Sequence, residues 1–311
     1  MVDLSPDVQR ALRTLTIDRA TVAVSTALTA VGIEHVLLKG PSTARWLYAD
    51  PAQRAYIDTD LLLQRRDLTV AVDALKVLGL AAPLRHASGH EQDGHSVVLR
   101  PTCDGDSEVD LHHSLPGVRV DDAALWAALC RHRSTHTMLH EAIPILDEVG
   151  RSLVVVLHAA RNGLTDGQST EDLRLLVTRE LDWPAVLVLA NEVNAGAALA
   201  RGLRLLPEGA DAVRLLALES VTSVEMALRD AAAPALAYGL DRLAHTPGLR
   251  GKALLLARET WPTAAFLHYW APREGLSGRS TRQLRTDRLR YLVRGATSAA
   301  RAWTAARRRS R

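Results

Sequence analysis

Apolar residues recur at helical spacing over the first thirty positions and then gather into short strand-like runs. Between residues 8 and 31 they return every three or four positions, and Gly32 follows, which predicts a helix that ends at a glycine. An apolar strand is expected to begin at His35, and a second one spans residues 56–63. A short helix is predicted between these strands, starting just after Gly40.

The same alternation continues to residue 113. A helix is predicted at residues 67–78, and short strands at residues 96–100 and 108–113. The segment between these two strands contains Asp104-Gly105-Asp106, which is a turn signal, so the strands are expected to pair as a hairpin. This order of helices and strands predicts a mixed sheet.

Beyond Pro116 the pattern predicts helices only, at residues 121–131, 147–162, 170–179, 183–201, 211–228, 231–244 and 252–259. The change of pattern predicts an α+β protein, in which an N-terminal mixed sheet with flanking helices is followed by an all-α C-terminal domain. The expected divisions are residues 1–116, residues 117–272 and an arginine-rich helical tail at residues 273–311.

The composition fits a soluble folded protein. Of the 311 residues, 47% are apolar and 23% are charged; no window is apolar enough to span a membrane, and the N-terminus does not resemble a signal peptide, so a cytoplasmic location is expected. The segment from Arg273 onward holds twelve arginines and two acidic residues, a net charge of +10, whereas the remainder holds 26 basic and 33 acidic residues, a net charge of −7. Such a tail can bind nucleic acid, acidic lipid or the acidic body of its own protein.

Two aspartates at alternate positions distinguish the second strand. Asp58 and Asp60 are predicted to share one face of it, and the leucines that follow indicate that the strand is otherwise buried. Carboxylates roughly 6–7 Å apart on one face repel each other until a cation lies between them, so the pair predicts a divalent metal site. A solvated sheet edge is the alternative. Asp110, in the neighbouring hairpin strand, is expected to supply a third ligand, with Glu108 as a substitute.

The turn between the first strand and the helix after it has the features of a phosphate site. Lys39, Gly40 and Ser42 stand where backbone N–H groups, an ammonium and a hydroxyl could contact phosphate oxygens, although glycine also precedes helices in ordinary turns. Arg45 and Arg54 bracket the following loop. They could reach a triphosphate, and solvated arginines are the alternative.

The histidines offer further candidates. His112 shares the predicted face of Asp110, and it is expected either to bind phosphate or the leaving group or to cap the strand end. Two other groups of histidines lie close enough in the sequence to bind zinc: His86, His90 and His95, and His132, His136 and His140. Neither group has the spacing or the partners of a standard zinc ligand set, so solvated side chains are expected for both.

Taken together, these segments resemble a known family. Leu-Leu-Lys39-Gly40, then Arg54-x-x-x-Asp58-x-Asp60-Leu-Leu-Leu, then Val109-Asp110-Leu111-His112, is similar to the uncharacterised nucleotidyltransferase family within the DNA polymerase beta-like superfamily. The resemblance covers the first 115 residues and is looser beyond them, through Leu157-His158, Trp261-Pro262 and residues 288–294. The sequence departs from the superfamily pattern where Pro41 separates Gly40 from Ser42 and where fifteen residues separate Ser42 from Asp58.

The resemblance implies a polymerase beta-like catalytic domain at residues 1–116 and a helical domain that selects the substrate. It implies that Asp58, Asp60 and Asp110 hold two Mg²⁺ ions while a nucleoside triphosphate transfers its nucleoside monophosphate to an acceptor and pyrophosphate leaves. The nucleotide-binding residues would be Lys39, Gly40, Ser42, Arg45, Arg54 and His112. The expected acceptor is a small molecule or peptide; the alternatives are RNA 3′ ends or a protein, encouraged by the basic tail, and a non-catalytic nucleotide-binding module.

Overall fold

The chain forms two compact units in a computed structural model that describes residues 5–82, 95–102 and 107–310. The first unit contains the described residues up to Ser220, and the second contains those from Val221 onward. These units do not coincide with the expected divisions at residues 116 and 272, because the sheet and the helices packed on it continue well past residue 116. The functional division of the chain therefore stays a prediction.

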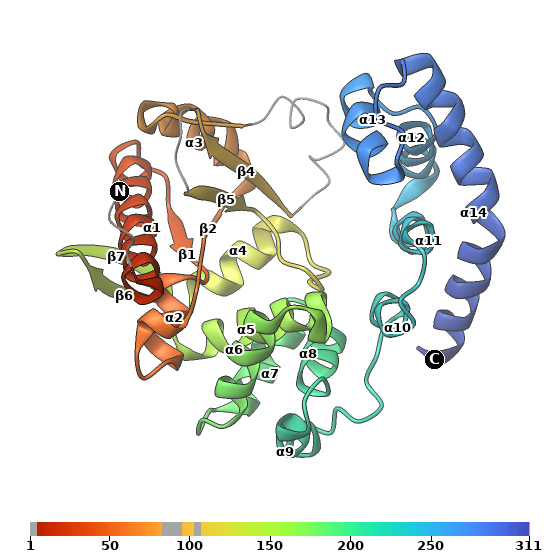
Figure 1. Ribbon diagram of the computed structural model, residues 1–311. Helices are drawn as coiled ribbons and strands as arrows, with labels where there is room; N and C mark the ends of the chain where they lie inside the picture. Colours follow the sequence, from red (N-terminus) through yellow and green to blue (C-terminus); the bar gives the residue numbers. More distant parts are fainter. Residues whose placement is uncertain (1–4, 83–94, 103–106, 311) are drawn as a thin grey trace. The chain divides into compact units, whose positions relative to one another are not determined.

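The described strands of the first unit form one seven-stranded sheet in the order β3-β4-β5-β2-β1-β7-β6 (Figure 1). Their bounds are β1 His35–Leu37, β2 Asp58–Leu63, β3 Leu80–Ala81, β4 Ser96–Pro101, β5 Glu108–His112, β6 Arg133–Met138 and β7 Glu141–Leu146. The pairs β2–β5 and β1–β7 are parallel, and the other pairs are antiparallel. The mixed sheet and the β4–β5 hairpin are confirmed, while the turn Asp104–Asp106 falls in a segment outside the described residues.

The prediction that only helices follow residue 116 was wrong. Residues 133–146 form the hairpin β6–β7, and β7 pairs with β1, with Leu37 opposite Ile145. The sequence pattern does not predict this hairpin, because the β6 sequence Arg-Ser-Thr-His-Thr-Met lacks an apolar alternation and because Pro144 interrupts β7. His136 therefore lies on a strand, and His140 lies in the hairpin turn at φ +72°.

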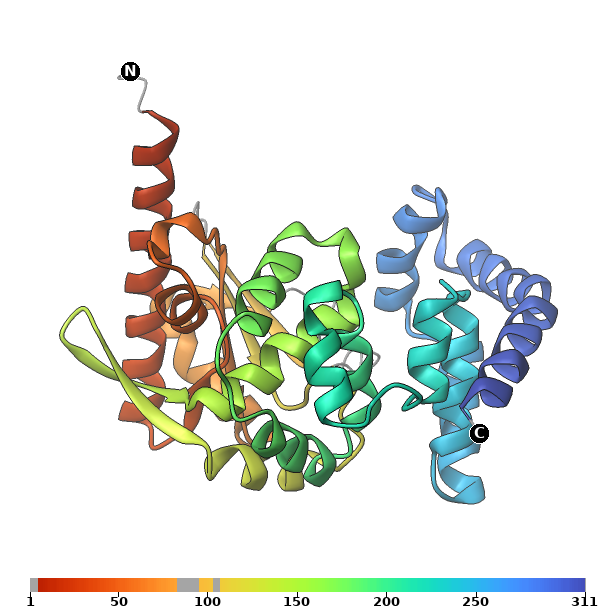
Figure 2. The ribbon, with the colours of Figure 1, turned by 90° about the horizontal axis from the view of Figure 1, so that it is seen from below.

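Helices surround the sheet in the first unit: α1 Pro6–Ala30, α2 Pro41–Leu47, α3 Leu68–Leu75, α4 Asp122–Cys130, α5 Glu148–Asn162, α6 Gly167–Val177, α7 Trp183–Glu192, α8 Gly196–Leu203 and α9 Ala210–Leu215. The single helix expected at 183–201 is two helices, because Asn194 between α7 and α8 takes a left-handed φ of +52°. The first turns of α1 extend beyond the sheet, where Leu12 and Leu15 are exposed (Figure 2).

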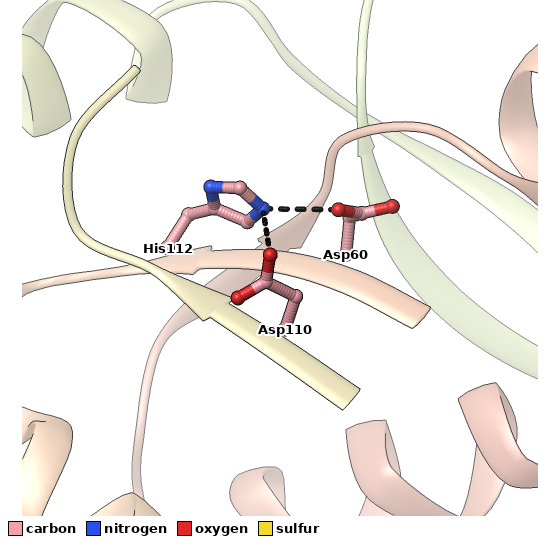
Figure 3. A group of neighbouring side chains, drawn as sticks. All are labelled: Asp60, Asp110 and His112. Carbon is pink, nitrogen blue, oxygen red and sulfur yellow. Dashed lines mark hydrogen bonds and ion pairs between the residues drawn. The ribbon is translucent and has the colours of Figure 1, made fainter. Parts of the chain in front are cut away.

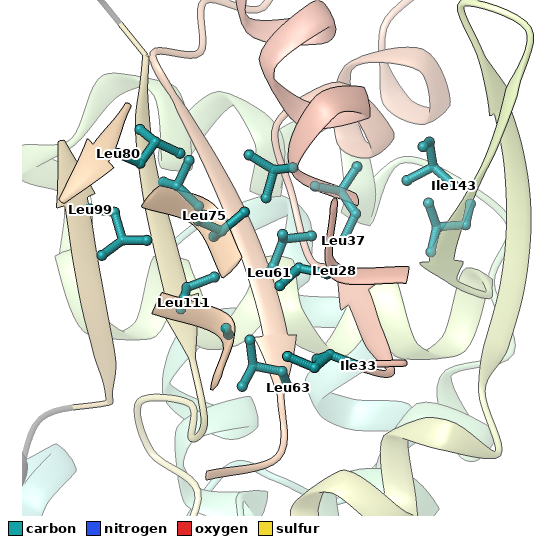
Figure 4. Packing of buried hydrophobic residues seen from close by; sticks show 14 of the residues in the cluster. Leu28, Ile33, Leu37, Leu61, Leu63, Leu75, Leu80, Leu99, Leu111 and Ile143 are labelled. Atoms are coloured by element: carbon teal, nitrogen blue, oxygen red, sulfur yellow. The ribbon is translucent and has the colours of Figure 1, made fainter. Parts of the chain in front are cut away.

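The main hydrophobic core lies between the sheet and two of these helices. Leu28 of α1 and Leu75 of α3 pack with Leu61 and Leu63 of β2 and with Leu111 of β5 (Figure 4). Side chains alternate faces along a strand, so the residues between these leucines lie on the opposite face of the sheet. The aspartates of β2 and β5 occupy that opposite face, which α1 and α3 do not cover.

The second unit is helical, with α10 Val224–Asp230, α11 Ala235–His245, α12 Gly248–Thr260, α13 Ala264–Trp270 and α14 Thr281–Arg309. The helix predicted at 211–228 is wrong, since it spans the division between the units and is interrupted between α9 and α10. The arginine-rich α14 packs on the helices before it through buried Leu284, Ala299 and Ala306. None of the helices, as far as the structure describes them, combines the length and the apolar character that a membrane span requires.

Candidate active site

The parallel register of β2 and β5 brings the predicted carboxylates together. Asp60 lies opposite Asp110, and Asp58 lies opposite Glu108. Glu108, the substitute ligand, forms an ion pair with Arg100 instead, at 2.7 Å. Asp60 is fully buried and Asp110 is half-buried. The register therefore places one carboxylate from each strand at the same level of the sheet.

His112 joins these two carboxylates through one nitrogen (Figure 3). Its Nε2 lies 2.9 Å from Asp60 Oδ1 and 3.2 Å from Asp110 Oδ2. Burial alone would lower the pKa of this imidazole, but Asp110 and Asp60 outweigh it and raise the pKa to about 9. The ring is thus a cation at neutral pH. Its contacts are with the carboxylates themselves. Binding of phosphate or of the leaving group by His112 stays a prediction.

The two aspartates remain ionised for the same reason. Burial would raise the pKa of Asp60, but the ammonium of Lys39 and the imidazolium of His112 hold that pKa well below its usual range. Lys39 Nζ lies 3.1 Å from Asp60 Oδ1. The pKa of Asp110 is likewise lowered, because its hydrogen bond with His112 outweighs its burial. At neutral pH the centre formed by Asp60, Asp110, His112 and Lys39 therefore holds two carboxylates and two cations.

The donor set fits a hard divalent cation. Asp60 Oδ2 and Asp110 Oδ1 are buried and have no hydrogen-bond partner among the described residues. Buried carboxylate oxygens rarely stay unpaired, and they are the ligands that Mg²⁺ prefers. Asp60, Asp110 and His112 each offer an atom within 4.8 Å of the others, and Asp58 is not a member of that close group.

Asp58 differs from the other carboxylates in its protonation. It is the first residue of β2 and is only partly buried. Burial and the negative charge of Asp60 raise its pKa to about 6, although Lys39 acts in the opposite direction. A cation bound beside Asp58 would relieve this repulsion, so the electrostatics favour a metal on the shared face of β2.

The glycine turn lies beside the carboxylates. Gly40 precedes α2 at φ +68°, a conformation that L side chains rarely adopt, and a Cβ there would meet the carbonyl of Asp58 at 3.5 Å. The turn thus approaches the backbone of β2 closely. Ser42 is buried, and its hydroxyl makes one long contact of 3.5 Å to the carbonyl of Lys39. Within the glycine turn, Lys39 is the residue whose side chain contacts Asp60 directly.

The two predicted triphosphate arginines make ion pairs within the protein. Arg45 binds Asp18 of α1 at 2.5 Å and is a quarter exposed. Arg54 is buried and binds both oxygens of Asp172 on α6, with Nη2 2.7 Å from Oδ2 and Nε 2.9 Å from Oδ1. Its Nη1 donates to the carbonyl of Gly40 at 3.4 Å. Arg54 therefore connects α6 to the glycine turn, and neither arginine is a solvated side chain.

A polar group on α5 and α6 was not predicted as part of the site. His158 of α5 lies 3.1 Å from Asn162, and Asn162 Nδ2 lies 2.8 Å from Asp166 at the start of α6. Burial and the nearby charge of Lys39 lower the pKa of His158 to about 4. The sequence offered one signal, the Leu157-His158 segment of the family resemblance, but it could not show which face of α5 turns toward Lys39.

The remaining histidines show no zinc site among the residues that the structure describes. His86 and His90 lie outside the described residues, and only His95 of that group can be placed. His132 hydrogen-bonds Asp147 at 3.0 Å. The one cluster of potential metal ligands in the described chain is the group around Asp60.

Comparison with known proteins identifies a family. The model of a family described as "Uncharacterised nucleotidyltransferase" matches residues 7–209, which confirms the resemblance seen in the sequence. No curated protein matches the chain. The match covers all of the strands and the helices from α1 to α8.

Solved structures show distant likenesses. An antigenic nucleotidyltransferase-like protein from Paracoccidioides brasiliensis is 16% identical, with a TM-score of 0.41 over 64% of this chain and 92% of that one. The antibiotic-resistance factor ANT(2'')-Ia is 12% identical, with a TM-score of 0.39 over 57% of this chain and 90% of that one. A tRNA-processing enzyme is 13% identical, with a TM-score of 0.27 over 92% of this chain and 78% of that one. Likenesses at this level do not specify a substrate.

Proposed function

The chain belongs to the uncharacterised nucleotidyltransferase family, and from this premise we propose that it transfers a nucleoside monophosphate from a nucleoside triphosphate to an acceptor. The acceptor is a hydroxyl or phosphate of a small molecule or peptide. Mg²⁺ is bound during the reaction, and pyrophosphate is released. Nucleotidyl transfer as a class of reaction follows from the family. The metal, the nucleotide and the acceptor are the proposal. The observation that carries it is the pair of buried, unpartnered carboxylate oxygens on Asp60 and Asp110.

The metal ligands in this proposal are Asp58, Asp60 and Asp110. All three point to the face of the sheet opposite the main core, and two magnesium ions need more carboxylates than one pair supplies. Bound there, Mg²⁺ would neutralise charge on the phosphates and lower the pKa of the acceptor hydroxyl. His112 holds the two central carboxylates in place by bonding both of them.

The protein groups around the aspartates have separate roles. Lys39 supplies positive charge next to Asp60, where its ammonium can also reach a phosphate oxygen. Asp110 is a weak base for the proton of the acceptor, because its pKa is lowered. Without metal, Asp58 has a pKa raised to about 6 and is ionised at neutral pH, so it is the stronger base of the two.

Arg54 acts as a positioning residue in this proposal. It is buried between Asp172 of α6 and the carbonyl of Gly40, so it fixes the glycine turn relative to the helices that follow the sheet. Arg45 fixes α2 to α1 through Asp18. Ser42 is too buried to meet a nucleotide without a rearrangement, so the phosphate contacts of the turn fall to its backbone and to Lys39.

The direct test uses nucleoside triphosphates labelled at the α-phosphate, incubated with Mg²⁺ and a fraction of small molecules, of peptides or of RNA. We expect label to move to a small molecule or peptide, and we expect Asp60→Asn to lower the rate at least about a hundredfold, the scale of losing a charged group that stabilises the transition state. Asp73→Asn is the matched control, because Asp73 pairs with Lys76 at the surface of α3, which packs on the opposite face of the sheet.

Other outcomes separate the alternatives. Unchanged transfer in Asp60→Asn or Asp110→Asn would refute the proposed centre. Binding of a triphosphate without transfer to any fraction would indicate a non-catalytic nucleotide-binding module. Label on RNA or on a protein would replace the proposed acceptor.

The arginine-rich helix provides a separate test of the RNA alternative. Removing residues from Arg273 onward would also remove the buried contacts of α14 and disrupt the second unit. Exchange of exposed arginines to glutamine avoids this, and the suitable positions are Arg290, Arg294, Arg301 and Arg308. If RNA is the acceptor, the fourfold variant should lose RNA retention at low salt. If the acceptor is a small molecule, transfer should stay unchanged.

A further inference from the structure

The protonation of His158 follows from its hydrogen bonds. Asp166 Oδ2 is a carboxylate oxygen that can only accept, so the amide nitrogen of Asn162, 2.8 Å away, must donate to it. The same nitrogen lies 3.1 Å from His158 Nε2 and donates its second hydrogen there. Nε2 is therefore an acceptor, and the proton of the neutral ring resides on Nδ1.

Asp166, the acceptor for Asn162, is itself held by the start of α6. Asp166 is the N-cap of α6, and its other oxygen accepts from the backbone N–H of Gln168 at 3.1 Å. Asp172, six residues after Asp166, anchors the same helix to Arg54 and to the hydroxyl of Tyr48 at 2.7 Å. The hydrogen bonds from Asn162 to His158 and to Asp166 favour this orientation of the imidazole.

The Nδ1 donor of His158 has no hydrogen-bond partner among the described residues, and 28% of the side chain is exposed. Asp172 of α6 holds Arg54 against the carbonyl of Gly40, and His158 is linked through Asn162 to the start of the same helix. This places His158 on the side of the site where α6 meets the glycine turn. The charges of Lys39 and Asp60 also act on the ring. The Nδ1 donor of α5 and the glycine turn that carries Lys39 thus lie on one side of the site. Two neighbouring donors suit an anionic ligand.

We propose that His158 is a recognition residue for the nucleotide, whose Nδ1–H donates to an oxygen of the triphosphate that Lys39 also contacts. The inference rests on the proposed function and adds to it a phosphate contact from the helical part of the chain. With its low pKa the ring stays neutral at physiological pH, so its contribution is a directed hydrogen bond and not proton transfer.

Three substitutions separate this role from a structural one. His158→Ala removes the donor. His158→Asn puts an amide nitrogen near the place of Nδ1, whereas His158→Gln puts it near the place of Nε2. Binding of a nucleoside triphosphate with a methylene bridge between the α- and β-phosphorus is measured by calorimetry with Mg²⁺, with the corresponding nucleoside as a second ligand.

We expect His158→Ala and His158→Gln to raise the Kd for the triphosphate about tenfold, the scale of one hydrogen bond to a charged group, and His158→Asn to restore binding to within about threefold of wild type. Nucleoside binding should not change. In transfer assays the KM for the triphosphate should rise while that for the acceptor stays constant.

The inference is overturned if His158→Ala binds the triphosphate as wild type does, if His158→Asn is as weak as His158→Gln, or if the acceptor KM rises instead. Should the alanine variant fail to fold, the comparison of asparagine with glutamine still decides. Failure of the proposed function itself looks different, because wild-type protein would then bind no triphosphate or would transfer no label.

Discussion

Replacement of His112 by glutamine tests the electrostatics of the centre without any knowledge of the substrate. Glutamine keeps a donor near the place of Nε2 but cannot carry a charge. The imidazole of His112 is buried, bonds Asp60 and Asp110, and has its pKa raised from 6.5 to about 9. The wild-type protein therefore keeps a proton on folding that the unfolded chain releases above pH 6.5.

The sign and size of the effect follow from this shift. Below pH 6.5 both states hold the proton, and the ion pairs contribute fully to stability. Between pH 6.5 and about 9 the unfolded state loses its proton first, so stability falls by up to about 1.4 kcal/mol for each pH unit. The whole window amounts to about 3 kcal/mol, and above it the contribution of His112 is lost.

Urea unfolding followed by circular dichroism at pH 6, 7, 8 and 9 measures this difference. The wild-type unfolding free energy should fall by about 3 kcal/mol more across the range than that of His112→Gln. Carbon-detected titration of the histidine rings should show one imidazole with a midpoint near 9 that is missing from the variant. Parallel pH profiles in the two proteins would refute the assignment of His112 as a buried cation.

Three further predictions concern neighbouring residues. Asp172→Asn should destabilise the first unit by about 3–5 kcal/mol in urea unfolding, because it leaves the Arg54 guanidinium buried without its counter-charge; Arg54→Met combined with Asp172→Leu should recover much of this. Gly40→Ala should cost about 1–3 kcal/mol, because φ +68° with ψ −118° is a conformation that glycine adopts far more readily than alanine, although space for a methyl group exists; an equal cost at a glycine in ordinary helix geometry would contradict this cause. Mg²⁺ affinity measured by calorimetry should weaken below pH 6 as Asp58 takes up a proton, and Asp58→Asn should flatten that dependence.

The parts of the fold that the sequence predicted are those with a strong hydrophobic period. The strand at 58–63 and the hairpin strand at 108–112 have apolar side chains on the core side, and the helix at 148–162 has a strongly amphipathic pattern. The hairpin 133–146 lacks such a pattern, because β6 is polar and Pro144 interrupts β7, so only the pairing of β7 with β1 reveals it. Breaks within helices, such as the one at Asn194, depend on a single backbone conformation that composition does not encode.

In the candidate site, too, the sequence predicted local relations and missed contacts between distant segments. Alternation predicted that Asp58 and Asp60 share one face of β2 and that Asp110 and His112 share one face of β5, because these relations are local to each strand. The partners of Arg54 and of His112 depend on which residues from distant segments meet, and Asp172 stands 118 residues away from Arg54. A single sequence contains no direct signal for such contacts.

The position of β7 has a consequence for how the chain can be made and divided. The inner strand β1 has β2 on one side and β7 on the other, and β7 is not complete until residue 146 is synthesised. A nascent or truncated polypeptide that stops at residue 116 would leave the apolar β1 as a bare edge, a site for pairing with other chains. Assembly on the ribosome must therefore wait for a distant hairpin, and shorter N-terminal fragments should precipitate when expressed alone.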